Sequence, residues 1–176
     1  MRPPVIGLTG KARSGKDTVA NFIVASVGGY QYAFADPLRN MLAAGFGINI
    51  MDPYWATRKE EVIPALGKSP RQLMQTLGTE WGRQCVGENV WVVLAKAKLL
   101  EKGAGMVISD VRFENEASWV RKIGGRVLHV RRETNIEVSP HASEGGVAMG
   151  EGDAIIHNNS TVEELQNQVR LFMEGQ

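Results

Sequence analysis

The sequence of 176 residues has a single cysteine, Cys85, so no disulfide bond can form within the chain. Its formal net charge is only +1, which provides no overall field to attract nucleic acid or an anionic membrane. No apolar run approaches the length that crosses a bilayer, and the residues before the first apolar segment are too few for a signal peptide. These absences predict a soluble cytoplasmic protein that binds neither nucleic acid nor a membrane.

No internal repeat or low-complexity tract interrupts the sequence. A chain of 176 residues is long enough for a substantial core, and we expect a single domain over residues 1–176. Short apolar segments alternate with helical patterns, and the segments predicted as strands are 5–9, 32–35, 106–109, 126–130 and 154–156. This alternation predicts an α/β fold with a five-stranded parallel sheet, helices on both faces, and ligands beyond the carboxyl ends of the strands.

Capping signals mark where several helices are expected to begin. Asp36 and Ser69 each precede a proline, and both are expected to cap the helix that follows. Asn115 is expected to cap a helix that begins at the next residue, and Thr161 with Glu164 has the spacing of a capping box.

A phosphate-binding loop is predicted between the first apolar segment and a helical pattern over residues 19–25. The glycines of such a loop permit backbone angles that turn successive N–H groups into one concavity, which the positive end of the next helix also faces. Lys16 is expected to reach the terminal phosphates of a nucleotide. The alternative, a glycine-rich turn without a ligand, does not explain the lysine. The predicted loop consists of Gly10, Lys11, Ala12, Arg13, Ser14, Gly15, Lys16, Asp17 and Thr18.

This loop departs from the usual pattern at one position. Asp17 stands where a serine or threonine normally follows the lysine, and Thr18 comes next. Nucleoside monophosphate kinases with a Gly-Lys-Gly-Thr loop are similar in placing the hydroxyl one position later. Thr18 is therefore the candidate magnesium-facing hydroxyl. The carboxylate of Asp17 is stabilised by the helix dipole and could contact water on the metal ion.

Charged residues follow two of the predicted strands. Asp110 and Arg112 come directly after segment 106–109, where Asp110 could hold Mg²⁺ through water and Arg112 could grip an acceptor phosphate with its two-pronged donor geometry. The alternative is a helix-capping aspartate beside a surface arginine. Asp36 and Arg39 follow segment 32–35 in the same way, and Arg39 could face the acceptor or simply be solvated.

A helix expected to begin at Pro70 carries the candidates for recognising a base. Arg71, Gln75 and Gly78 share one face, where Gly78 leaves room for a flat group and Gln75 can read a base edge. An ordinary packed helix has the same periodicity. Trp91 is likewise compatible with a core anchor or with a stacking platform for a base.

The stretch 133–153 is polar and glycine-rich, which suits a mobile flap over bound phosphates. Arg131 and Arg132 precede it, and we expect a lid over about residues 132–152. His141 lies inside this stretch, where a histidine is more often solvated than catalytic.

Taken together, these motifs resemble those of the phage-type deoxynucleoside monophosphate kinases of the P-loop kinase superfamily. The helix segment Leu-Met-Gln-x-Leu-Gly-Thr and the pair Asp-x-Arg are more selective signals than the phosphate-binding loop. The matching segments span nearly the whole chain in order: 13–18, 57–60, 71–79, 110–112, 129–132 and 153–165.

The resemblance implies a three-layer α/β/α kinase fold with substrate-binding helices, an acceptor-binding insertion over about residues 40–100, and a lid. It implies transfer of the γ-phosphate of ATP, with Mg²⁺, to a deoxynucleoside monophosphate. Lys16 and the loop are assigned to ATP, Arg132 to the transition state, and Asn158 to the adenine region. A viral origin and a homodimer are further expectations. The implied substrate-binding residues are Asp36, Arg39, Arg58, Arg71, Gln75, Gly78, Trp91, Asp110 and Arg112.

Two departures and two alternatives remain open at the level of the sequence. The chain is shorter than some family members between residues 60 and 70, and Asp36 stands where a small residue can occur, so the acceptor pocket and the base preference could differ. Another small-metabolite kinase, of the dephospho-coenzyme A or phosphomevalonate type, fits the same loop. A regulatory P-loop NTPase fits less well, because the sequence has neither an Asn-Lys-x-Asp motif nor a catalytic glutamate after the strand before Asp110.

Overall fold

The structure is a computed structural model that describes residues 4–133 and 146–175. The chain divides into two compact units, one formed by residues up to 33 together with residues from 95 onward, and the other by residues 34–94. The predicted lid falls largely on residues 134–145, which lie outside the described residues, as does His141.

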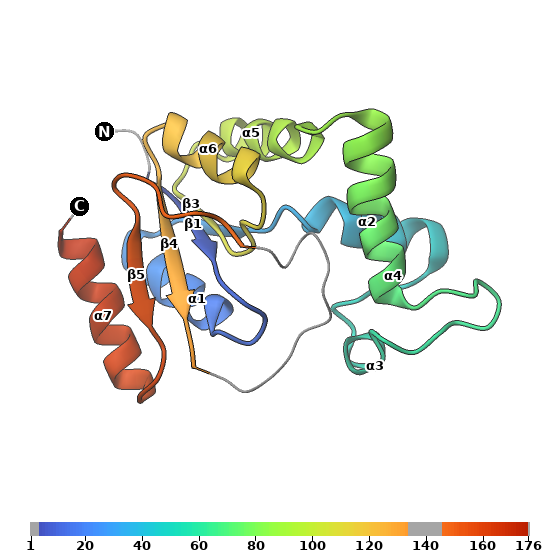
Figure 1. Ribbon diagram of the computed structural model, residues 1–176, viewed down its shortest axis with the longest axis horizontal. Coiled ribbons are helices and arrows are strands. Elements are labelled where there is room, and N and C mark those ends of the chain that lie inside the picture. Colours follow the sequence, from blue (N-terminus) through green and yellow to red (C-terminus); the bar gives the residue numbers. More distant parts are fainter. Residues whose placement is uncertain (1–3, 134–145, 176) are drawn as a thin grey trace. The chain divides into compact units, whose positions relative to one another are not determined.

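The first unit contains a five-stranded parallel sheet with the strand order β2-β3-β1-β4-β5 (Figure 1). The sheet confirms the predicted α/β fold. Its strands are β1 (Val5–Thr9), β2 (Tyr30–Tyr32), β3 (Met106–Ile108), β4 (Arg126–Arg131) and β5 (Ala154–His157). The helices associated with it are α1 (Lys16–Val27), α5 (Val90–Lys102), α6 (Glu114–Lys122) and α7 (Val162–Glu174).

Successive residues of β1 pack against helices on opposite faces of the sheet, as the period of two in a strand requires. Ile6 and Leu8 are fully buried in a core cluster that also contains residues of α1 and α7. Gly7 faces α6, and a Cβ atom there would lie 2.8 Å from the side chain of Val111 and 3.4 Å from that of Val120. The result is a three-layer arrangement in which glycine allows α6 to approach the sheet closely.

The second unit is helical and has a small core of its own. Leu42, Ile48 and Ile50 are buried there, with Leu73 and Leu77 among the apolar residues packed against them. Its elements are α2 (Asp36–Phe46), α3 (Pro53–Thr57), α4 (Pro70–Gln75) and the π-helix η1 (Thr76–Val86), and the chain leaves it along α5.

Two of the predicted helix starts are confirmed. The hydroxyl of Ser69 accepts a hydrogen bond from the backbone N–H of Gln72, and the Gln72 side chain accepts one from the N–H of Ser69. This reciprocal pair satisfies two backbone donors and fixes the start of α4. The hydroxyl of Thr161 accepts from the N–H of Glu164 and caps α7.

Three local predictions were wrong. The second strand ends at Tyr32, its last pairing partner being Ile108, so residues 33–35 do not belong to the sheet, although Ala33 and Phe34 are buried. Asp36 is the first residue of α2 rather than its cap, which is Ala35. The helix expected to be capped by Asn115 instead begins at Glu114, because Glu116 accepts hydrogen bonds from the preceding backbone and fixes an earlier start.

In the part of the chain that the structure describes, none of the helices combines the length and the apolar character needed to cross a membrane.

Candidate active site

The loop after β1 is shaped by two glycines that no other residue could replace without movement. Gly10 has φ of 147°, and a Cβ atom there would lie 2.2 Å from the carbonyl oxygen of Val130. Gly15 has φ of 95°, and its Cβ would lie 2.2 Å from the side-chain nitrogen of Asn158. Both positions therefore require positive φ and close approach of the backbone to a neighbour, which is what a phosphate cradle demands.

Lys16 is the first residue of α1, and its side chain folds back over the loop. Its ammonium group donates hydrogen bonds to the carbonyl oxygens of Gly10, at 2.8 Å, and of Lys11, at 2.7 Å. The side chain is half-buried and lines the pocket described next. The Lys16 ammonium group is thus held at the positive end of α1, where phosphate binding is favoured.

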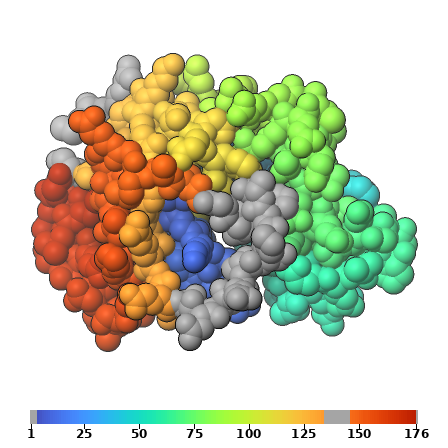
Figure 2. All heavy atoms as spheres, viewed as in Figure 1, coloured from blue at the N-terminus to red at the C-terminus, as the bar shows by residue number. Residues whose placement is uncertain are grey.

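A cavity of about 500 Å³ opens at the carboxyl ends of β1 and β4, and Figure 2 shows the blue atoms of the early chain in a hollow beside the orange atoms of β4. Among the described residues, five cationic side chains line it against one carboxylate, that of Glu133, so this lining suits polyanions. Its lining residues are Thr9, Gly10, Lys11, Ala12, Lys16, Val111, Arg112, His129, Val130, Arg131, Arg132, Glu133, Gly146, Val147, His157 and Asn159.

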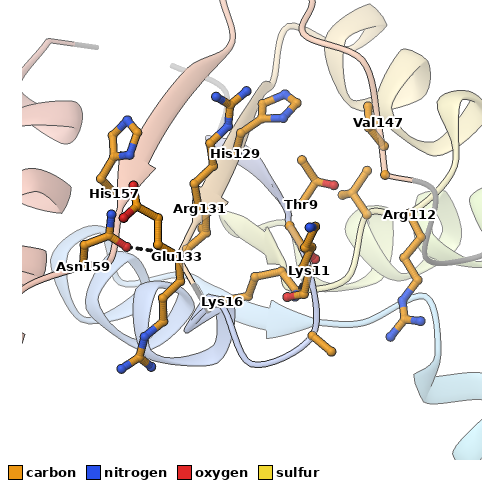
Figure 3. A pocket seen from close by; sticks show the side chains of 16 residues that line it. Thr9, Lys11, Lys16, Arg112, His129, Arg131, Glu133, Val147, His157 and Asn159 are labelled. Carbon is orange, nitrogen blue, oxygen red and sulfur yellow. Dashed lines mark hydrogen bonds between the residues drawn. The ribbon is translucent and has the colours of Figure 1, made fainter. Parts of the chain in front are cut away.

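Two walls of this cavity face each other across the loop lysines. Arg112 lies on one side, and the pair Glu133 and Asn159 on the other (Figure 3). The backbone N–H of Glu133 donates a hydrogen bond to the side-chain oxygen of Asn159, at 2.9 Å, which joins the chain after β4 to the chain after β5. This hydrogen bond therefore connects, on that side of the cavity, the segments that follow two neighbouring strands.

Arg112 is held by its backbone while its guanidinium group is exposed. The carboxylate of Glu116, which is only 2% exposed, accepts hydrogen bonds from the N–H groups of Arg112, at 2.8 Å, and of Phe113, at 3.1 Å. This buried carboxylate fixes the turn between β3 and α6, and the turn sets the direction in which Arg112 leaves the backbone.

The two residues predicted to face magnesium differ in exposure. Thr18 is exposed in the first turn of α1, and Asp110 is buried after β3, with 8% of its surface accessible. Both supply oxygen ligands of the kind that Mg²⁺ prefers. No group of three or more His, Cys, Asp or Glu residues that could hold a metal occurs among the described residues.

Asn158 connects the phosphate-binding loop to the sheet. Its side-chain amide donates to the carbonyl of Ser14, at 2.9 Å, and its backbone N–H donates to the carbonyl of Arg131, at 2.7 Å. The resemblance placed Asn158 near the adenine of ATP. In the structure its side chain packs against Gly15 and bonds to the loop. A contact between Asn158 and a nucleotide stays a prediction.

Arg131 and Arg132 both line the cavity and are both exposed. Arg131 is the last residue of β4 and lies on the same face of the strand as His129, two positions earlier (Figure 3). Arg132 follows the strand, so the two arginines leave the backbone in different directions. Their separate roles stay predictions.

Several predicted acceptor residues lie in the second unit and make ion pairs within it. Asp36 and Arg39 are paired at 2.8 Å, and Arg71 is paired with Glu60. Arg58 stacks on the ring of Tyr54 at 4.1 Å. Asp110 and Arg112, in contrast, belong to the unit that contains the sheet.

Trp91 and Gly78 contact each other directly. Trp91 is only 2% exposed, and its indole N–H donates to the carbonyl of Gly78, at 2.9 Å. A Cβ atom on Gly82 would lie 2.2 Å from the Trp91 ring, so the π-helix packs its glycine against the indole. Trp91 therefore anchors this helix, and a role of either residue in base recognition stays a prediction.

No pattern in the sequence indicates the buried polar cluster that lies beside the cavity. The carboxylate of Asp153, with no exposed side-chain surface, accepts hydrogen bonds from Arg121, at 2.6 Å, and from the backbone of Gly150, at 2.8 Å, and its Oδ2 lies 3.1 Å from the ring of His129. Burial would raise the pKa of Asp153, but these hydrogen bonds, led by that from Arg121, outweigh burial and hold it below its ordinary value.

Comparison with known proteins gives consistent matches over most of the chain. A family model described as deoxynucleotide monophosphate kinase matches residues 4–67 and 66–169. A protein of Acanthamoeba polyphaga mimivirus is 30% identical over 182 residues, covering 94% of this chain and 93% of that protein. The deoxynucleotide monophosphate kinase of Enterobacteria phage T4 is 26% identical over 233 residues, covering 94% of this chain and 97% of its own.

Solved structures share the fold at lower identity. TT1252 from Thermus thermophilus has a TM-score of 0.56 and 15% identity, with 99% of this chain and 98% of that chain covered. At this identity the likeness concerns the arrangement of the sheet and its helices.

Proposed function

Because the chain belongs to the deoxynucleotide monophosphate kinase family, we propose that it transfers the γ-phosphate of ATP to a deoxynucleoside monophosphate, giving ADP and a deoxynucleoside diphosphate. The family match favours a nucleotide acceptor over the dephospho-coenzyme A and phosphomevalonate acceptors that fit the same loop. It also favours a kinase over a regulatory NTPase.

The observation that carries this proposal is the cavity beside the phosphate-binding loop. It gathers Lys11, Lys16, Arg112, Arg131 and Arg132 around one space at the carboxyl edge of the sheet. Phosphoryl transfer depends mainly on positioning two phosphate-bearing substrates and on stabilising the charge that moves between them. A cavity rich in cations at the positive end of α1 meets both needs.

The roles proposed for individual residues follow from where each lies. The N–H groups of the loop and Lys16 hold the phosphates of ATP, since Lys16 lies at the loop itself. Arg112 receives the phosphate of the acceptor with its fork of N–H donors. Arg132 meets the transferred phosphoryl group, where its charge acts most strongly in the transition state.

Magnesium is proposed to bind with the phosphates of ATP, and Thr18 in the first turn of α1 and Asp110 after β3 supply oxygen donors of the kind it prefers. Mg²⁺ bound there would neutralise negative charge on the phosphates of ATP. Thr18 would bind it directly or through water, and Asp110 through water. Asp17 lies beside Thr18 in the first turn of α1, where its carboxylate could accept a hydrogen bond from metal-bound water.

The second unit is proposed to recognise the acceptor nucleoside. Asp36, Arg39, Arg58, Arg71 and Gln75 supply the charged and amide groups for this purpose, and the contact of Trp91 with Gly78 holds the π-helix that follows Gln75. The partners of the protein are thus small-molecule nucleotides.

The experiment that tests the proposal measures ADP release from ATP with and without each of the four deoxynucleoside monophosphates. We expect ADP release to depend on at least one monophosphate and on Mg²⁺. Equal ADP release with no acceptor present would favour a regulatory NTPase. The same assay is repeated with dephospho-coenzyme A and with phosphomevalonate, and ADP release only with one of these two acceptors would favour the other kinase class.

A further inference from the structure

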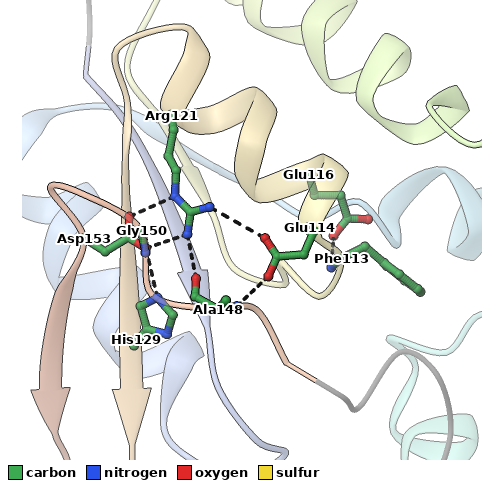
Figure 4. A network of polar contacts seen from close by, with 8 residues as sticks. All are labelled: Phe113, Glu114, Glu116, Arg121, His129, Ala148, Gly150 and Asp153. Carbon is green, nitrogen blue, oxygen red and sulfur yellow. Dashed lines mark hydrogen bonds and ion pairs between the residues drawn. The ribbon is translucent and has the colours of Figure 1, made fainter.

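An ion pair between Arg121 and the buried carboxylate of Asp153 joins three segments that contain residues of the cavity lining or lie next to them, and all three belong to the unit that contains the sheet. Its centre is the carboxylate of Asp153, to which Arg121 donates from Nη2, at 2.6 Å, and from Nε, at 3.2 Å (Figure 4). Such a bidentate arrangement fixes the orientation of both groups as well as their distance. With the Asp153 side chain fully buried, its charge has no water to compensate for the loss of Arg121.

The first segment that this pair holds is the stretch that leads into β5. Arg121 Nη2 also donates to the carbonyl of Ala148, at 2.8 Å, and the N–H of Gly150 donates to Asp153. Residues 148–153 are thereby fastened to α6 at both ends. Gly146 and Val147, which line the cavity, immediately precede the fastened residues.

The second segment is the first turn of α6. Glu114 lies 3.7 Å from Arg121 Nη1 and accepts a hydrogen bond from the N–H of Ala148. Two residues before Glu114 is Arg112, whose N–H is held by Glu116 of the same helix. The position of Arg112 in the cavity therefore depends on a turn that Arg121 helps to hold.

The third segment is β4. His129, which lines the cavity, has its Nε2 atom 3.1 Å from the Asp153 carboxylate. Because Asp153 is ionised and can only accept, the proton of this hydrogen bond belongs to His129 Nε2. The bond sets the orientation of the ring on the same face of the strand as Arg131.

We propose that Arg121 and Asp153 are positioning residues for phosphoryl transfer, acting by holding Arg112, His129, Gly146 and Val147 in fixed relative positions around the cavity. This role rests on the proposed kinase activity. Neither residue lines the cavity, so both act through others. Within the described part of the chain, the contacts of Arg121 and Asp153 are with α6, β4 and residues 148–153, and not with the phosphate-binding loop. Loss of the pair should therefore affect binding of the acceptor and the rate of transfer more than binding of ATP.

The test compares Arg121→Gln, Arg121→Lys and Asp153→Asn with the parent protein. The number of ATP-binding sites in each sample is counted by calorimetry, and kcat is expressed per ATP-binding site, so that loss of folded protein does not imitate loss of turnover. The matched control is Arg170→Gln, which removes an exposed arginine paired with Glu174 at 2.7 Å on α7.

For Arg121→Gln and Asp153→Asn we expect kcat per site to fall about tenfold to a hundredfold, the order that a misplaced catalytic group costs. KM for the monophosphate should rise, and the Kd of ATP should change less than about threefold. Arg121→Lys keeps the charge but lacks the planar fork, so it should restore the melting temperature more than kcat. The control should match the parent in all four quantities.

Parental kcat per site in Arg121→Gln and Arg121→Lys would overturn the positioning role, even if both melt at lower temperature. Loss of ATP affinity with unchanged kcat would also overturn it. If the parent protein itself phosphorylates no deoxynucleoside monophosphate while it binds ATP, the proposed function is wrong and the positioning role is wrong with it.

Discussion

The side-chain amide of Asn158 donates a hydrogen bond to the backbone carbonyl of Ser14, at 2.9 Å, and occupies the space where a Cβ atom on Gly15 would lie. Asn158, which directly follows β5, thus holds the phosphate-binding loop in place, although 144 positions separate it from Ser14. The shape of the loop depends on this contact as well as on its own glycines.

Replacing Gly15 by alanine should remove most ATP binding. The new Cβ would lie 2.2 Å from Asn158, and the φ of 95° would strain any side chain. Gly28→Ala is the matched control, because its φ of 67° is also positive but no atom lies within 4 Å of the new Cβ. Calorimetric titration with ATP should show near-parental affinity for Gly28→Ala, and equal affinity in both variants would contradict the account of the loop.

Removing Asn158 should have a smaller effect of the same kind. Asn158→Ala loses one hydrogen bond to Ser14, which is worth about 0.5–1.5 kcal/mol, so the Kd of ATP should rise about twofold to tenfold. An unchanged Kd would mean that the loop keeps its shape without this contact.

Arg112→Ala should raise KM for the monophosphate much more than KM for ATP. A charge-assisted contact with phosphate contributes about 1.5–3 kcal/mol, which corresponds to about tenfold to a hundredfold in binding. Lys122→Ala removes an exposed cation at the other end of α6 and serves as the control. Initial rates with each substrate varied in turn give the two KM values separately. An increase confined to KM for ATP would mean that Arg112 contacts ATP and not the monophosphate.

Arg132→Ala should lower kcat and leave both KM values nearly unchanged, because Arg132 is proposed to meet the phosphoryl group mainly in the transition state. Arg131→Ala is the informative comparison, since Arg131 leaves β4 on the face that carries His129. If Arg131→Ala loses turnover and Arg132→Ala does not, the catalytic assignment belongs to Arg131. If neither loses turnover, this part of the chain does not take part in transfer.

The features that sequence patterns predicted correctly are those set by neighbours along the chain. The strand at Val5–Thr9 is a continuous apolar run, and the loop after it has its glycines and lysine at fixed spacing. Ser69 caps α4 through a residue only three positions away. The second strand was placed wrongly because buried residues in a connecting segment, such as Phe34, have the same apolar character as a strand.

The features that could not be predicted depend on contacts between distant parts of the chain. Arg121 and Asp153 are 32 positions apart, and His129 and Asp153 are 24 apart, so no local spacing indicates that they meet. The π-helix over Thr76–Val86 has a period too close to that of an α-helix to be distinguished from it. The hydrogen bond between Trp91 and Gly78 likewise follows only from tertiary packing.

The depressed pKa of Asp153 makes its contribution to stability depend on pH in a defined direction. A carboxyl whose folded pKa lies below its ordinary value of 3.8 stabilises the fold above that value and loses this contribution as pH falls through the folded pKa. Arg121 and His129 face this carboxylate, and Arg121 stays positively charged throughout that acidic range. We therefore expect urea unfolding to show a constant difference between the parent and Asp153→Asn from about pH 5 to 7, and a smaller one below about pH 4. A difference that grows on acidification would contradict the ionised state of Asp153.

The protein is proposed to move the γ-phosphate of ATP to a deoxynucleoside monophosphate at the loop that carries Lys16. The most direct measurement incubates ATP labelled in the γ-phosphate with each monophosphate and Mg²⁺, and separates the labelled products. We expect label in a deoxynucleoside diphosphate with the parent, and almost none with Lys16→Ala at an unchanged melting temperature, because Lys16 is half-buried at the loop and its loss leaves the core intact. Label found only as inorganic phosphate, or equal transfer by Lys16→Ala, would contradict the account.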